Sequence, residues 1–126
     1  MRGPIKVLLA EDNEIYRSTL ELLLDGRDKI TVVGAVADGN AAVAAVAELE
    51  PHVVLMDFRL PGLDGAQATA AVRALRPDTA VICLTAEAGD DDRVAVLAAG
   101  AVALLEKGRP TDEIVDAIRS AVQGET

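Results

Sequence analysis

Short apolar runs alternate with stretches of helical periodicity along the whole chain. The apolar runs have strand length and are rich in branched aliphatic residues; they span residues 5–10, 30–37, 52–56, 79–84 and 101–105. The segments between and after them repeat apolar residues at helical spacing: 13–25, 41–48, one ending near 75, one beginning near 89, and 110–122. Five β-α units in strict alternation predict an α/β fold with a parallel sheet and helices on both faces.

Polar residues and glycine mark the ends of several predicted helices. Asp38 and Asp64 precede helical stretches and are typical N-cap residues. Gly100 stands where a helix commonly ends in a left-handed residue. The first predicted helix has apolar residues at the spacing of one buried face: Tyr16, Leu20, Leu23 and Leu24.

Chemically active side chains follow the predicted strands. In open α/β sheets the functional crevice lies outside the carboxyl ends of the strands. This rule selects the residues at those ends: Glu11, Asp12, Asp57, Thr85 and Lys107. Three carboxylates brought close together repel one another and need protons or a metal ion to coexist. Oxygen ligands with open positions favour a hard cation such as Mg²⁺.

The same residues have the components of a phosphoryl-transfer site. An aspartate such as Asp57 can act as a nucleophile and form an acyl phosphate. Lys107 can pair with a carboxylate and then hold a phosphoryl oxygen as a point charge, and the Thr85 hydroxyl can donate to the same group. Phosphoryl transfer needs mainly alignment and charge neutralisation, which Mg²⁺ and the lysine would supply.

Composition narrows the class of protein. The 126 residues predict a single domain, and 51% hydrophobic with 26% charged residues is typical of a globular one. A net charge of −9 disfavours binding of nucleic acid or an anionic membrane through this domain. The single cysteine, Cys83, excludes an internal disulfide, and no apolar run has the length of a membrane span. We therefore expect a cytoplasmic domain.

Four motifs, in order and each at a strand end, together resemble a response-regulator receiver domain of two-component signalling. They are Glu11-Asp12-Asn13, the run VVLMDFRLPGLDG (residues 53–65), Thr85-Ala86 and Leu105-Glu106-Lys107. The D-x-R-x-P-x-x-D-G run is most similar to the NarL/FixJ subgroup, and the resemblance covers essentially the whole chain. It implies a flavodoxin-like, doubly wound (βα)5 fold with strand order 2-1-3-4-5.

The resemblance also implies a role for each residue at the strand ends. Asp57 would accept a phosphoryl group from a phosphohistidine on a sensor histidine kinase. Thr85 would be the switch hydroxyl, and Lys107 would contact the phosphoryl group. Magnesium, or manganese in its place, would be held by Glu11, Asp12, Asp57 and the backbone carbonyl of Arg59. The domain would catalyse only its own phosphorylation and dephosphorylation and would not be a turnover enzyme.

The subgroup resemblance extends to partners and domain organisation. Receivers of this subgroup usually precede a LuxR-type helix-turn-helix, so residues 1–126 are expected to be the N-terminal receiver of a longer DNA-binding regulator. DNA would be bound only through that further domain, and no membrane partner is expected. Phosphorylation would change the surface of the last two β-α units, regulate an output such as transcription, and allow homodimerisation through an interface that the sequence leaves open.

Three positions near the predicted site raise further questions. The family usually has an aromatic switch residue three positions before the lysine, and this chain has Leu104, so how it transmits activation is open. Arg59 and Glu87 each lie two residues after a site residue. We hypothesise that they pair across the mouth of the site and restrict attacking water.

Other functions are weighed against this one. A phosphohydrolase of the haloacid-dehalogenase kind would have a second aspartate where Arg59 stands, and a flavin carrier would not have two acids after its first strand. A pseudo-receiver, acting only in docking, remains an alternative because of Leu104. His52 lies at the start of its strand, opposite Asp57, and is interpreted as a surface residue. Cys83 is interpreted as an inert buried residue.

Overall fold

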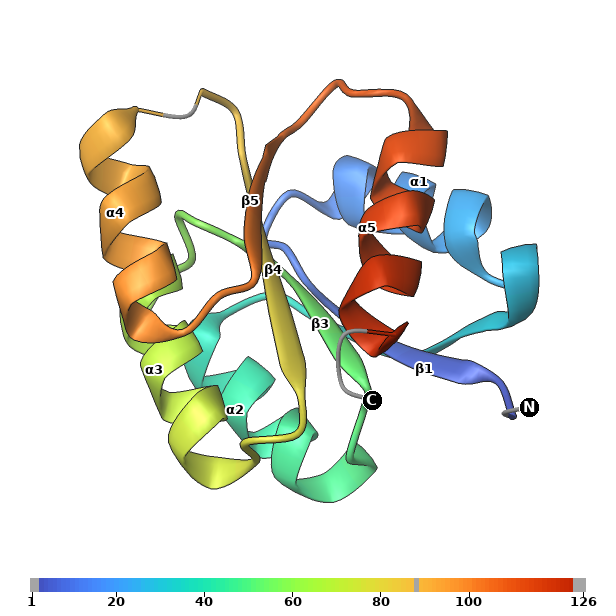
Figure 1. The fold of residues 1–126 in the computed structure, drawn as a ribbon, viewed down its shortest axis with the longest axis horizontal. Coiled ribbons are helices and arrows are strands. Elements are labelled where there is room, and N and C mark those ends of the chain that lie inside the picture. Colours follow the sequence, from blue (N-terminus) through green and yellow to red (C-terminus); the bar gives the residue numbers. More distant parts are fainter. Residues whose placement is uncertain (1–2, 88, 124–126) are drawn as a thin grey trace.

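A five-stranded parallel sheet forms the centre of the computed structural model, which describes residues 3–87 and 89–123 (Figure 1). The strand order is β2-β1-β3-β4-β5, and every pairing is parallel. The strands are β1 (Ile5–Ala10), β2 (Ile30–Val36), β3 (Val53–Asp57), β4 (Ala80–Thr85) and β5 (Ala103–Glu106). Both the alternation of elements and the predicted strand order are confirmed.

Helices cover both faces of the sheet. They are α1 (Glu14–Leu24), α2 (Gly39–Leu49), α3 (Gly65–Leu75), α4 (Asp90–Ala99) and α5 (Thr111–Gln123). Figure 1 shows α2, α3 and α4 on one side of the sheet and α1 and α5 on the other. A short 3₁₀ turn, Arg27–Lys29, links α1 to β2 and was not predicted. None of the described helices is long and apolar enough to cross a bilayer.

Two apolar cores are separated by the sheet. The α2–α4 core lies between the sheet and helices α2, α3 and α4, and the α1–α5 core lies between the sheet and helices α1 and α5. Along β3, Val54 and Met56 point into the α2–α4 core, whereas Val53 and Leu55 point into the α1–α5 core. All residues of β3 are buried, as its continuous apolar run predicts for a central parallel strand.

The predicted helix ends are confirmed by their capping bonds. The Asp38 carboxylate accepts the N–H of Ala41 at 2.7 Å, and Asp64 forms a reciprocal capping box with Gln67. Gly100 ends α4 with a φ of 114°. The buried face of α1 was predicted too broadly, since Leu23 is 46% exposed. Of the predicted face, Leu20 and Leu24 are the residues that α1 buries.

The connection after β3 is closed at its base. The Phe58 N–H donates to the carbonyl of Leu84 at 2.8 Å, and the Gly65 N–H donates to the Phe58 carbonyl at 2.7 Å. A Cβ atom at Gly65 would lie 2.7 Å from the Cα of Phe58, so only glycine fits this close approach. The loop between these residues is therefore fastened at both ends directly beside Asp57.

Polar side chains near the amino ends of the strands form hydrogen bonds with backbone groups of neighbouring segments. The His52 Nδ1 accepts the Lys6 backbone N–H at 2.9 Å, and the Thr79 hydroxyl donates to the Pro51 carbonyl at 2.8 Å. Arg73 donates to the carbonyls of Pro77 and Thr79. His52 does lie at the opposite end of β3 from Asp57. Its position away from the acids agrees with its interpretation, but the residue is half-buried and its ring nitrogen bonds the start of this segment to β1.

Candidate functional site

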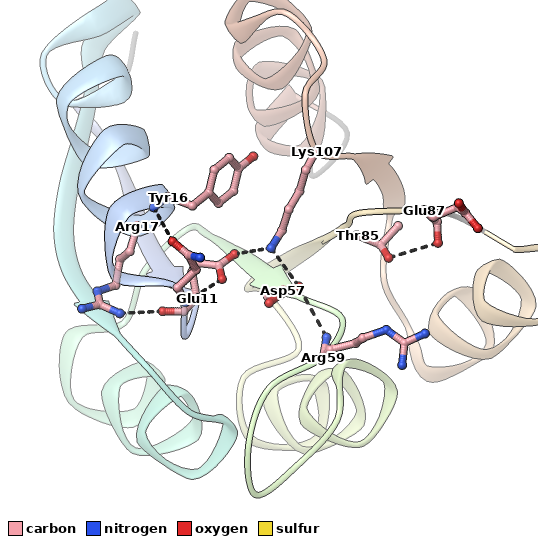
Figure 2. A network of polar contacts seen from close by, with 9 residues as sticks. Glu11, Tyr16, Arg17, Asp57, Arg59, Thr85, Glu87 and Lys107 are labelled. Carbon is pink, nitrogen blue, oxygen red and sulfur yellow. Dashed lines mark hydrogen bonds and ion pairs between the residues drawn. The ribbon is translucent and has the colours of Figure 1, made fainter.

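The carboxyl ends of four strands bring the predicted site residues to one edge of the sheet (Figure 2). Glu11 directly follows β1, Asp57 and Thr85 are the last residues of β3 and β4, and Lys107 directly follows β5. Backbone bonds hold the two residues that lie just outside strands. The Glu11 N–H donates to the carbonyl of Val36 at 2.9 Å, and the Lys107 N–H donates to that of Thr85 at 2.7 Å.

Three carboxyl groups cluster at this edge. One oxygen from each of Glu11, Asp12 and Asp57 lies within 4.8 Å of the others. Glu11 is 2% exposed and Asp57 is 6% exposed, whereas Asp12 faces solvent. The Oε2 atom of Glu11 accepts the N–H of Asn13 at 2.9 Å, which fixes one side of its carboxylate.

Lys107 is the cation that lies between the two buried acids. Its Nζ atom is 2.7 Å from Oε1 of Glu11 and 3.4 Å from Oδ1 of Asp57. The short contact to Glu11 is an ion pair, and among the described residues this ammonium is the partner of the buried Oε1 atom. A single ammonium therefore serves two buried carboxylates, and negative charge remains.

The environment shifts the ionisation of the two central groups. Burial, followed by the negative charge of Glu11, raises the pKa of Asp57 to about 6, although Lys107 and the Arg59 N–H at 3.4 Å oppose this shift. Burial alone would lower the pKa of Lys107, but its contacts with Glu11 and Asp57 outweigh that effect, and the pKa is raised. At neutral pH the lysine is charged and Asp57 is mostly ionised.

The acid cluster fits a divalent, oxygen-seeking cation. Its donors are carboxylate oxygens from three side chains, two of them buried, and their charge exceeds that of the single lysine. Mg²⁺ is held in this way by few carboxylates together with waters. Glu11, Asp12 and Asp57 could hold such an ion. The predicted contribution of the Arg59 carbonyl stays a prediction, and the described contact of this residue with Asp57 is through its N–H.

Thr85 and Arg59 border the cluster but point elsewhere. The Thr85 hydroxyl donates to the carbonyl of Glu87 at 3.3 Å, away from Asp57 (Figure 2). The Arg59 guanidinium lies 5.9 Å from the centre of the Phe58 ring. The hypothesised ion pair between Arg59 and Glu87 is wrong for this conformation, because none of the ion pairs within residues 3–87 and 89–123 joins them.

Comparison with known sequences identifies the family. The family model described as "Response regulator receiver domain" matches residues 7–119. The chain belongs to this family. It is 40% identical to the transcriptional regulatory protein LiaR of Bacillus subtilis and 35% identical to the response regulator GacA of Pseudomonas protegens, each over 96% of the chain. It spans 57% of the length of each of these relatives, which are regulators rather than classical enzymes.

Solved receiver structures have the same fold as this chain. The signal receiver domain assigned to the response regulator NarL of Mycobacterium tuberculosis superposes with a TM-score of 0.93 at 32% identity, covering 98% of this chain and 99% of that one. A LuxR-family response regulator from Aurantimonas gives a TM-score of 0.91 at 28% identity, covering 97% and 87%. The resemblance to the NarL and LuxR type of receiver that the motifs predicted is thus confirmed.

Within this receiver domain, Leu104 lies outside the acid cluster. It is 4% exposed, packs in the α2–α4 core and is paired in register with Cys83 of β4. The Arg93 guanidinium of α4 donates to the Leu104 carbonyl at 3.3 Å. Leu104 is therefore placed to couple β5 to α4 through packing rather than to contact the acids. Cys83 is buried, which raises the pKa of its thiol to about 11 and agrees with its interpretation as unreactive.

Tyr16 is a site residue that sequence reasoning missed. It was assigned only to the apolar face of the first helix, yet its ring centre lies 4.8 Å from the Lys107 Nζ. A signal was available, since Tyr16 lies in the first turn of a helix that begins directly after the acid pair. A side chain there starts at the same edge of the sheet as Glu11 and Asp12.

Proposed function

We propose that this receiver domain accepts a phosphoryl group on Asp57 from a phosphohistidine of a sensor histidine kinase. The observation that carries the proposal is a buried aspartate beside a second acid, with one lysine between them. That arrangement leaves negative charge uncompensated at a place where a divalent cation can bind. Family membership supports the same activity.

The transfer is a displacement at phosphorus. An ionised oxygen of Asp57 forms the new P–O bond while the P–N bond of the donor breaks, and the donor imidazole keeps the electron pair and takes up a proton. With a pKa of about 6, Asp57 is mostly the required carboxylate at neutral pH. Hydrolysis later returns the aspartate and inorganic phosphate. The domain would therefore catalyse only its own phosphorylation and dephosphorylation.

Charge neutralisation would be shared between a metal ion and Lys107. When bound, Mg²⁺ would supply positive charge for the acids and for the phosphoryl oxygens. Glu11, Asp12 and Asp57 would hold it, together with the Arg59 carbonyl. The ammonium of Lys107, now 3.4 Å from Asp57, would hold a phosphoryl oxygen as a point charge.

The conformational change would begin at Thr85. Its hydroxyl now donates to the Glu87 carbonyl, and rotation toward a phosphoryl oxygen would break that bond. The connection between β4 and α4 would then be free to move. Leu104, packed beneath α4 and linked to Arg93, would pass this movement to the outer surface of the last two β-α units.

The output we infer is regulation of transcription within a longer protein. The chain spans 57% of the length of the relatives named above, and one of these is a transcriptional regulatory protein. With a net charge of −9, this domain would leave DNA binding to a C-terminal helix-turn-helix domain. Its place would be the cytoplasm, and phosphorylation would favour a homodimer.

Intact-mass measurement after incubation with acetyl phosphate and Mg²⁺ tests the acceptor. The wild-type protein should gain the mass of one phosphoryl group, and the Asp57→Asn variant or omission of Mg²⁺ should abolish the gain. Asp64→Asn is the matched control, because Asp64 caps α3 on the same loop and asparagine caps equally well. A wild-type protein that neither gains mass nor binds beryllofluoride contradicts the proposal and favours a docking function.

A further inference from the structure

The Tyr16 ring and two carboxylates surround the same ammonium group. Lys107 Nζ lies 4.8 Å from the ring centre, 2.7 Å from Glu11 Oε1 and 3.4 Å from Asp57 Oδ1. Figure 2 shows the ring on one side of the lysine side chain and the acids at its tip. A cation at this distance from an aromatic ring is attracted to it electrostatically, and the attraction grows as water is excluded.

The ring and Glu11 are fixed relative to each other by a short hydrogen-bonded segment. The Asn13 N–H donates to Glu11 Oε2 at 2.9 Å, and the Asn13 side-chain oxygen accepts the Tyr16 N–H at 2.9 Å. Asn13 is also the N-cap of α1, so the same bonds that start the helix set the ring beside the acid. Tyr16 in addition packs against the α1–α5 core. The ring is therefore a pre-organised surface.

The Lys107 side chain, by contrast, has few restraints between its backbone and its ammonium group. Its side chain has several rotatable bonds, and it is followed by Gly108 with a φ of 91°. The Lys107 backbone is anchored by its N–H bond to the Thr85 carbonyl. Contacts at the tip of the side chain must then select its direction, and the ring contact is one that phosphorylation of Asp57 does not chemically alter.

We propose that Tyr16 is a positioning residue that holds the Lys107 ammonium over the acid pair before and after phosphoryl transfer. The expected effect on the rate of Asp57 phosphorylation rests on the proposed function. The contact between Tyr16 and Lys107 can be tested without phosphorylation. The aromatic face of Tyr16 attracts the ammonium, and the tyrosine hydroxyl is not needed for this contact. Tyr16→Phe should therefore behave as the wild type does, and Tyr16→Leu should lose the effect while still filling much of the space.

The contact can be measured directly because Tyr16 is the only tyrosine and the chain has no tryptophan. Tyrosine emission from the protein therefore reports on this one ring. Removal of the ammonium in Lys107→Met should change the intensity of that emission in Mg²⁺-free buffer with no phosphodonor present. Arg109→Met is the matched control, since Arg109 is two residues away and pairs with Glu113 on the surface. Its emission should equal that of the wild type.

The rate measurement compares phosphorylation by acetyl phosphate in the wild type, Tyr16→Phe and Tyr16→Leu. We expect Tyr16→Leu to be about fivefold slower at saturating donor and Mg²⁺, which corresponds to about 1 kcal/mol of cation–π attraction. Tyr16→Phe should restore the wild-type rate. Circular dichroism checks that each variant is folded.

Each outcome bears on a different proposal. If Tyr16→Leu is as fast as the wild type, or Tyr16→Phe is as slow as Tyr16→Leu, the positioning role of the ring is overturned. Equal tyrosine emission in Lys107→Met and the wild type overturns the contact itself. If the emission changes as expected but the wild type gains no phosphoryl group by any donor, the proposed function fails while the Tyr16–Lys107 contact stands.

Discussion

The two ends of the same sheet treat their polar groups in opposite ways. At the amino ends of the strands, His52, Thr79 and Arg73 each form hydrogen bonds with backbone groups of neighbouring segments. At the carboxyl ends, the buried carboxylates of Glu11 and Asp57 share one ammonium, that of Lys107. Polar groups at the first end stabilise the fold, whereas those at the second end leave charge for a ligand to neutralise.

This difference identifies which end performs chemistry. Buried acids that repel each other lower the free energy of unfolding, and such an arrangement is found where a metal ion or phosphoryl group is to be bound. Buried hydrogen bonds that are complete give no comparable reason to bind anything. Substitutions at the two ends should therefore differ in size, in sign and in their dependence on pH.

The largest effect is expected from removal of the shared cation. Lys107→Met should lower the free energy of unfolding by about 3 kcal/mol at pH 7.5 without Mg²⁺, because it leaves two buried carboxylates unpaired. Urea denaturation measures the change. The control Arg109→Met breaks an exposed pair and should cost less than about 0.5 kcal/mol. An equal loss of unfolding free energy in the two variants would contradict the view that the carboxyl ends hold buried charge that depends on one lysine.

A stabilising substitution is expected at the acceptor. Because the pKa of Asp57 is raised to about 6 in the folded protein, its ionisation destabilises the fold, and this penalty is absent below the unfolded pKa of about 3.8 and complete above pH 6. Asp57→Asn should raise the free energy of unfolding by about 2 kcal/mol at pH 7.5 without Mg²⁺, after allowance for solvent screening and the lost Lys107 contact. Denaturation at pH 4 should show no gain.

At the amino end the same kind of experiment should give a loss that does not depend on pH. Thr79→Val keeps the shape of the side chain but leaves the Pro51 carbonyl without its donor. The free energy of unfolding should fall by about 1.5 kcal/mol, by the cost of an unmade buried hydrogen bond. Urea denaturation at pH 6 and pH 8 should give the same difference between Thr79→Val and the wild type. A more stable variant would contradict the view that polar groups at the amino ends stabilise the fold.

The smallest effect is stabilisation by the metal ion. Mg²⁺ at ten times its Kd should raise the free energy of unfolding of the wild type by about 1.4 kcal/mol. Asp12→Asn, at the exposed member of the acid cluster, should require more Mg²⁺ for the same shift. Thermal melting with increasing Mg²⁺ measures both. A shift that is identical in Asp12→Asn would remove this residue from the metal site.

The location of the site could be predicted from the sequence, because the carboxyl ends of parallel strands share one edge. Asp57 and Lys107 are 50 residues apart in the printed sequence, yet each follows or ends a recognisable strand. The caps at Asp38 and Asp64 were predictable for a similar reason, since each depends on a few neighbouring residues. Local chemistry and topology together were sufficient for these features.

Other features depend on contacts that no local pattern contains. The bond between His52 and Lys6 joins residues 46 positions apart through a ring nitrogen. The direction of the Thr85 hydroxyl depends on the carbonyl of Glu87, and Arg59 lies against Phe58 rather than across the site. The turn at Arg27–Lys29 has positive φ angles at Asp28 and Lys29, where glycine would be the usual signal.

The strict alternation of β3 between two cores also limits how this gene can change in length. Loss of Leu55, for example, would turn over the residues that follow it, sending Met56 toward the α1–α5 core, and would displace Asp57 from the edge that it ends. Insertions and deletions should therefore accumulate in the outer connections among descendants of this chain. The five codons of β3 should vary by substitution alone.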